Sequence, residues 1–155
     1  MSLRPLRYWV PSLAWMLFLF VCSTDYFSAD STRAGMENTF SVLKGGVPPD
    51  KLDLINLIFR KCCHVVGYSV LAYFFAVGFQ KNKEPWCGLH LKTVAYVFLA
   101  TIAYAVLDEW HQSFSPVREA TLKDVLWDAS GAAIALAAMV FYQYSSVCKL
   151  PEIRP

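Results

Sequence analysis

The sequence predicts an all-α membrane protein, a bundle of four transmembrane helices with both termini in the cytoplasm. Hydrophobic residues make up 56% of the 155 residues, and the mean hydropathy is +0.38. Apolar side chains therefore exceed what the core of one soluble domain of this size can bury. We expect the surplus to face lipid, on helices supplied by four apolar stretches that polar segments separate.

The first apolar stretch predicts a helix over residues 8–24, which contain no charged residue and follow Arg4 and Arg7. Its length is close to the lower limit for a membrane span, about 17 residues. A cleaved signal peptide is the alternative, because such a peptide also places basic residues before an apolar run. Pro11 inside the run and the lack of a small-x-small cleavage site after it favour a retained helix.

A polar loop is expected over residues 25–53, outside the membrane, because this segment is mixed in charge and contains closely spaced glycines and prolines. At most one short amphipathic segment is expected within it. The other three helices are expected at about residues 57–79, 91–112 and 124–145, each around an apolar run of membrane length. All four helices belong to one predicted domain, residues 1–155.

The arrangement of lysine and arginine residues predicts the orientation. Both sides of the bundle carry the same number of them, but those near the termini and in residues 80–92 form short, compact clusters. Such clusters favour the cytoplasmic side. Cytoplasmic termini place the start of the second helix, the end of the third and the start of the fourth at the outer face, where we expect their polar residues to meet.

The densest run of ionisable residues lies in residues 107–131, with apolar segments on both sides. Ionisable groups at membrane level usually face the interior of a bundle and mark a functional path. Helical spacing adds two residues from the second helix, because they share one stripe of its surface. The predicted binding site comprises Lys61, His64, Asp108, Glu109, Gln112, Arg118, Asp124 and Asp128.

Two uses of this cluster stay open. Arg118, Lys61 and protonated His64 have the donors to hold a phosphate or a carboxylate. The carboxylates would then orient these bases or act as general acid and base, with Glu109, His64 and Asp108 as the catalytic candidates. Alternatively, the whole set is a network of ion pairs that only holds three helices together.

Some of these residues also have a simpler structural explanation. Lys61 and Arg60 can extend along the second helix to the membrane interface. Thr121 and Asp124 have the spacing of a capping box that would start the fourth helix, and Asp124 suits the positive end of its dipole.

Other kinds of site have no support in the sequence. The formal net charge is only +2 and no long basic run occurs, so nucleic-acid binding has no electrostatic basis. The five cysteines lack zinc-finger and C-x-x-C spacing, and one histidine among several carboxylates is a weak metal signal. No metal and no cofactor are expected. The sequence has no H-E-x-x-H motif, glycine-rich phosphate loop or nucleophile elbow.

Polar and small residues between residues 60 and 135 form one composite pattern. Its parts are Lys61-x-x-His64, Asp108-Glu109-x-x-Gln112-x-Phe114, Pro116-x-Arg118, Thr121, Asp124-Val125 and Gly131. In this combination the chain resembles the VanZ-like family of bacterial membrane proteins. Two positions depart from the family pattern. Asp128 stands where asparagine is usual, which adds a negative charge, and Val117 stands where glycine is common, which restricts the backbone.

The resemblance implies a multi-pass protein of the bacterial cytoplasmic membrane, in a family whose founding member is linked to teicoplanin resistance. We therefore expect a non-enzymatic protein, in contact with the bilayer, whose outer-face site binds an anionic envelope component. A lipid-linked cell-wall component is one such ligand, and its binding would affect glycopeptide susceptibility. One alternative is an intramembrane hydrolase or transferase that uses acid/base chemistry on a lipid phosphate. The other is a structural or partner-binding membrane module.

Overall fold

The computed structural model describes residues 6–42, 47–81, 88–116 and 121–145, and within these ranges the regular structure is entirely helical. The elements are η1 (Leu6–Tyr8), α1 (Val10–Cys22), η2 (Asp25–Phe27), α2 (Ala29–Ser41), α3 (Pro49–Gln80), α4 (Leu91–Gln112) and α5 (Leu122–Tyr144). The predicted all-α class is confirmed.

Three helices, α3, α4 and α5, are long and apolar enough to cross a membrane, and η1 with α1 forms a shorter apolar helix, Leu6–Cys22. Large apolar side chains lie on the outside of the bundle, among them Leu17, Leu99 and Ile134. Exposure of these apolar surfaces to water is unfavourable, whereas contact with lipid tails is not. The chain is therefore a multi-pass membrane protein, in agreement with the predicted bundle of four apolar helices.

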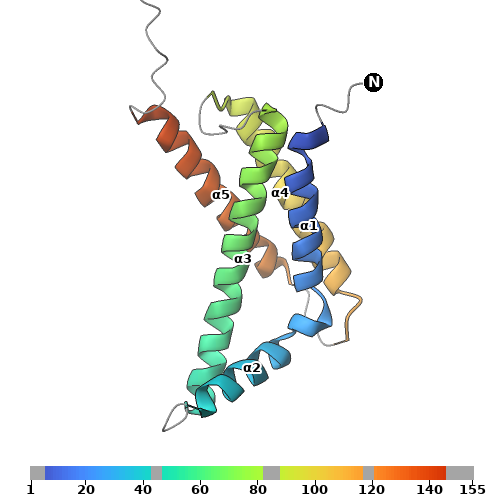
Figure 1. Ribbon diagram of the computed structural model, residues 1–155, viewed down its shortest axis with the longest axis vertical. Helices are drawn as coiled ribbons and strands as arrows, with labels where there is room; N and C mark the ends of the chain where they lie inside the picture. Colours follow the sequence, from blue (N-terminus) through green and yellow to red (C-terminus); the bar gives the residue numbers. More distant parts are fainter. Residues whose placement is uncertain (1–5, 43–46, 82–87, 117–120, 146–155) are drawn as a thin grey trace, which may run out of the picture.

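Helix α3 is the centre of the bundle, because it packs against α1, α2, α4 and α5. Figure 1 shows it running almost the full height of the molecule, with α5 crossing it obliquely. The start of α1 and the end of α5 lie at the same end of the bundle, at the top of Figure 1. This agrees with termini on one side of the membrane, and their cytoplasmic location stays a prediction.

The segment expected to be a loop, residues 25–53, instead contains α2 and the first turns of α3. Ser28 caps α2, since its side chain accepts a hydrogen bond from the Ser31 backbone N–H at 3.3 Å. Pro49 occupies the first turn of α3, where proline loses no helical hydrogen bond. The prolines that suggested a loop therefore begin a helix, and α3 starts before the expected residue 57.

Helix α2 folds back onto the first part of α3 and is held there by polar contacts. The Thr32 hydroxyl donates to Asn56 Oδ1 at 2.8 Å, and Asn56 Nδ2 donates to the Ala29 carbonyl at 2.9 Å. Arg33 pairs with Asp53 at 2.5 Å, and this hydrogen bond to Asp53 raises the pKa of the Arg33 guanidinium. These contacts join residues far apart in the sequence.

The core fills the space between α3, α4 and α5. Its fully buried apolar residues include Tyr68, Leu71, Ala72, Ala76, Val97, Ala105 and Ala132. Helices α3 and α5 approach closely at Gly131, where an added Cβ would lie 2.2 Å from the Val65 carbonyl oxygen. Ser69 Oγ also donates to the Gly131 carbonyl at 2.8 Å. This tight packing fixes how the polar residues one turn away face each other.

Candidate functional site

A cluster of polar side chains lies where α4 ends and α5 begins, beside the middle of α3. It brings together seven of the predicted site residues, and Arg118 lies outside the described residues. Most of the contacts among these residues join different helices. The residues of the cluster are Ser23, Lys61, His64, Tyr68, Asp108, Glu109, Gln112, Asp124 and Asp128.

Asp108 connects three helices through one oxygen atom. Its Oδ2 accepts hydrogen bonds from Ser23 Oγ at 2.6 Å, from Gln112 Nε2 at 3.1 Å and from the Tyr68 hydroxyl at 3.3 Å. The residue is only 4% exposed. Its Oδ1 is buried and has no hydrogen-bond partner among the described residues. An unpaired buried acceptor is costly, so this oxygen is suited to a donor from a ligand.

Two pairs join α3 to α5. The Lys61 ammonium forms a salt bridge with Asp124, and His64 Nδ1 lies 2.9 Å from Asp128 Oδ1. Asp128 is 1% exposed. Two of the three bases predicted to clamp an anion, Lys61 and His64, therefore already have a carboxylate partner. The contact at Nδ1 leaves the other ring nitrogen of His64, Nε2, without a hydrogen bond to any described residue.

Glu109 holds the start of α5. Its Oε2 accepts a hydrogen bond from the Thr121 backbone N–H at 2.8 Å, and its buried Oε1 has no hydrogen-bond partner among the described residues. Thr121 is the N-cap of α5, but its own side chain makes no capping bond. The fourth helix therefore starts after Thr121 as the motif predicted, but the predicted capping box is wrong, because a side chain from α4 supplies the acceptor instead.

Negative charge dominates the described part of the cluster. It contains four carboxylates but only one lysine and one histidine, and Asp128 Oδ2 is a third buried oxygen without a hydrogen-bond partner among the described residues. Among the described residues, no group of three or more His, Cys, Asp or Glu side chains could hold a metal ion. The inner end of the site thus offers acceptors for hydrogen-bond donors.

A cavity of about 640 Å³ leads to this cluster between α1, α2 and α3, and we call it the α1–α3 cavity. Apolar side chains such as Trp15, Phe18 and Leu19 line most of it. Its polar lining includes Ser23, His64, Tyr68 and Asp108, together with Arg60. Arg60 is half-buried and has no ion pair or hydrogen bond with any residue that the structure describes.

The profile of the VanZ/LLP1 family matches residues 8–143 of this sequence, from α1 to the last turn of α5. The chain belongs to the VanZ/LLP1 family. The resemblance predicted from the motifs is therefore confirmed. Comparisons with curated proteins and with solved structures gave no match.

Three residues of this VanZ/LLP1 site were not among the predicted site residues. Tyr68 and Ser23 donate to Asp108, and Arg60 lines the cavity. Tyr68 follows His64 by one turn of the same helix, so its spacing was a usable signal. Arg60 was expected to extend to the interface, and nothing near Ser23 in the sequence indicates a polar contact at the end of the first helix.

The two departures from the family pattern fall in different places. Asp128 is buried and lies against His64, so the extra carboxylate has a base beside it. Val117 lies outside the described residues.

Proposed function

We propose that this VanZ/LLP1 protein binds an anionic lipid of the bacterial cell envelope and thereby affects glycopeptide susceptibility. The observation that supports the proposal is the α1–α3 cavity, which is apolar along most of its lining and polar where it reaches Asp108. An amphiphile needs both surfaces. The volume of about 640 Å³ also lies within the range of ligand sites, roughly 300–1,000 Å³.

Arg60 is the best-placed group for the anionic part of such a lipid. Lys61 is already paired with Asp124, whereas Arg60 lines the cavity and has no ion pair among the described residues. A guanidinium can hold phosphate with two parallel hydrogen bonds. Arg118, which was predicted to clamp the anion with Lys61 and His64, lies outside the described residues.

The headgroup must also carry hydrogen-bond donors, because the carboxylate of Asp108 lies at the inner end of the same cavity. A second anionic group placed there would be repelled, whereas a hydroxyl or amide would satisfy its buried Oδ1. Many envelope lipids have both a phosphate for Arg60 and hydroxyl or amide groups for Asp108. Lipid-linked cell-wall components are among them.

Lipid binding by two variants that each lose one positive charge tests this proposal. Purified protein is titrated with a fluorescent phosphatidylglycerol, and Arg60→Gln is compared with Lys92→Gln. Loss of a charge-assisted hydrogen bond should weaken binding by about tenfold or more in Arg60→Gln. Lys92 is exposed in the first turn of α4 and does not line the cavity, so its variant should bind as wild type does. Equal affinity of wild type and Arg60→Gln would refute the proposal.

The effect on susceptibility needs a separate experiment in cells. Wild type, Arg60→Gln, Arg118→Ala and Glu109→Gln are expressed in a glycopeptide-sensitive host, with membrane insertion measured for each. Variants that insert normally but lose the shift in susceptibility support a binding site. Variants that insert normally and still shift susceptibility as wild type does would separate the site from that phenotype.

A second candidate is acid/base chemistry on a lipid phosphate, favoured by the pair of His64 and Asp128. Asp128 contacts Nδ1, so Nε2 is the ring atom left to take a proton, and His64 lines the cavity. In this mechanism Nε2 takes a proton from a water that attacks phosphorus, while the carboxylate stabilises the imidazolium. The P–O ester bond to the leaving group breaks, and the imidazolium then returns the proton to the leaving oxygen. Turnover of labelled lipids that disappears in His64→Gln supports it. No turnover by wild type across a panel of envelope lipids argues against it.

A further inference from the structure

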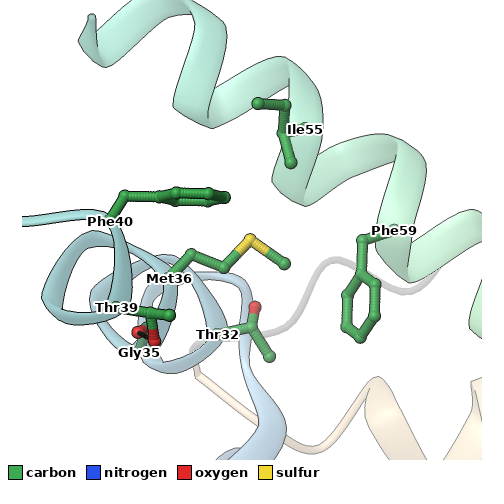
Figure 2. A pocket seen from close by; sticks show the side chains of 7 residues that line it. All are labelled: Thr32, Gly35, Met36, Thr39, Phe40, Ile55 and Phe59. Carbon is green, nitrogen blue, oxygen red and sulfur yellow. Dashed lines mark hydrogen bonds between the residues drawn. The ribbon is translucent and has the colours of Figure 1, made fainter. Parts of the chain in front are cut away.

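A second cavity, of about 440 Å³, lies between α2 and α3, and we call it the α2–α3 cavity. Figure 2 shows Met36 and Phe40 of α2 on one side of it and Ile55 and Phe59 of α3 on the other. Phe59 and Thr32 line this cavity and the α1–α3 cavity as well. The two apolar cavities are therefore adjacent, with Phe59 and Thr32 between them.

Polar contacts fix the position of α2 beside the α2–α3 cavity. The hydrogen bonds between Thr32 and Asn56 and between Asn56 and Ala29, with the ion pair of Arg33 and Asp53, fix α2 against α3. The space beside these contacts has Gly35 on one wall, and a Cβ there would meet nothing within 4 Å. The gap is thus set by how α2 is attached to α3.

Arg60, which has no ion pair with a described residue, lies next to the junction of the two cavities. Arg60 directly follows Phe59 in α3 and lines the α1–α3 cavity. An anionic group held by Arg60 would therefore have an apolar space on each side. A lipid with one chain would leave one of these spaces unfilled, whereas a lipid with two chains that branch near its phosphate could fill both.

We propose that the ligand is an anionic phospholipid with two hydrocarbon chains, one in each cavity, and with its phosphate at Arg60. This inference rests on the proposed lipid binding and narrows its ligand class, because it favours a two-chain phospholipid over a polyprenyl lipid with a single chain. The apolar walls of the two cavities complement the two hydrocarbon chains, and the positive charge of Arg60 complements the phosphate.

Gly35 provides a way to fill the α2–α3 cavity alone. Gly35→Leu places a side chain in open space, and leucine has a higher helix propensity than glycine, so α2 should fold normally. Gly35→Ala is the matched control, since one methyl group leaves most of the cavity free. The α1–α3 cavity, which Gly35 does not line, is unchanged in both variants.

The experiment measures competition of dioleoylphosphatidylglycerol and its one-chain lyso form for the purified full-length protein against a fluorescent phosphatidylglycerol. Wild type and Gly35→Ala should bind the two-chain form about tenfold more tightly, because its second chain gains packing contacts. Gly35→Leu should bind both forms with the affinity that wild type has for the lyso form.

Three results would overturn the inference. Equal binding of the two forms by wild type rejects two occupied cavities while leaving lipid binding intact. A preference for two chains that survives in Gly35→Leu rejects the α2–α3 cavity as the second chain site. Failure of wild type to bind either form rejects the proposed lipid binding itself, and this inference with it.

Discussion

His64 on α3 and Asp128 on α5 meet inside the bundle, with Nδ1 of the ring 2.9 Å from Oδ1 of the carboxylate. Asp128 is almost fully buried, and the histidine ring stacks on Tyr68 with the planes 4° apart. The pair lies one helical turn from the close approach of α3 and α5 at Gly131. It therefore contributes to helix packing and also orients a ring that lines the α1–α3 cavity.

Replacing Asp128 should separate these two roles. Asp128→Asn keeps the size of the side chain and an oxygen that can accept a hydrogen bond, so we expect only a small loss of stability. Asp128→Leu leaves a half-buried ring nitrogen of His64 without its partner and should lower the free energy of unfolding by about 1–3 kcal/mol. Unfolding of the purified protein in detergent measures both. A leucine variant as stable as the wild type would contradict this expectation.

Asp108 should be the most sensitive carboxylate of the cluster. Asp108→Ala removes the acceptor for the Ser23 and Tyr68 hydroxyls and for Gln112 Nε2, and the loss of these buried hydrogen bonds should cost about 3 kcal/mol together. Ser23→Ala removes one donor only and should cost about 1 kcal/mol. The same unfolding measurement ranks the variants, and equal losses would show that Asp108 is not the centre of the network.

The comparison of Asp108→Ala with Arg60→Gln also tests whether the cluster is only structural. Arg60 has no described polar partner, so Arg60→Gln should lower lipid affinity without changing the free energy of unfolding. If stability and binding fall together in Arg60→Gln, the arginine supports the fold. That result would favour the reading of this protein as a structural membrane module.

The helical fold and the family could be predicted because both depend on features local to the sequence. Apolar runs of membrane length mark the spanning helices wherever they pack. The family pattern likewise depends on residues within short stretches, such as Asp108, Glu109 and Gln112 on the last turns of α4. Their burial followed from the cost of exposing such groups to lipid.

The partners of the site residues could not be predicted, because spacing gives a stripe on one helix but not the rotation of one helix against another. Ser23 and Asp108 are 85 positions apart, and their contact depends on how α1 packs. A carboxylate beside Lys61 was expected, but the sequence did not indicate that it would be Asp124 of α5. For the same reason, one short amphipathic segment was expected where α2 lies but its position was not, since its attachment through Asn56 is a tertiary contact.

Bound lipid should protect two cysteines from modification. Cys62 and Cys63 are exposed free thiols that line the α1–α3 cavity. A small uncharged maleimide should label them in detergent, and saturating phosphatidylglycerol should slow the labelling, because the chain occupies the same space. Mass spectrometry of the peptide that contains both residues measures the rate. In Arg60→Gln the protection should require more lipid, and labelling that lipid does not slow would place the ligand elsewhere.

Gly131 should tolerate no side chain, in contrast to Gly35. A Cβ at Gly131 would lie 2.2 Å from the Val65 carbonyl oxygen, and because that atom belongs to the backbone, α3 and α5 must move apart. We expect Gly131→Ala to lower the free energy of unfolding by about 1–3 kcal/mol and to weaken lipid binding by displacing His64 from Asp128. Gly35→Ala meets open space and should be neutral or more stable by up to about 1 kcal/mol. Detergent unfolding curves for the two variants, recorded side by side, decide the matter. If Gly131→Ala unfolds no earlier than Gly35→Ala, α3 and α5 do not pack tightly at Gly131.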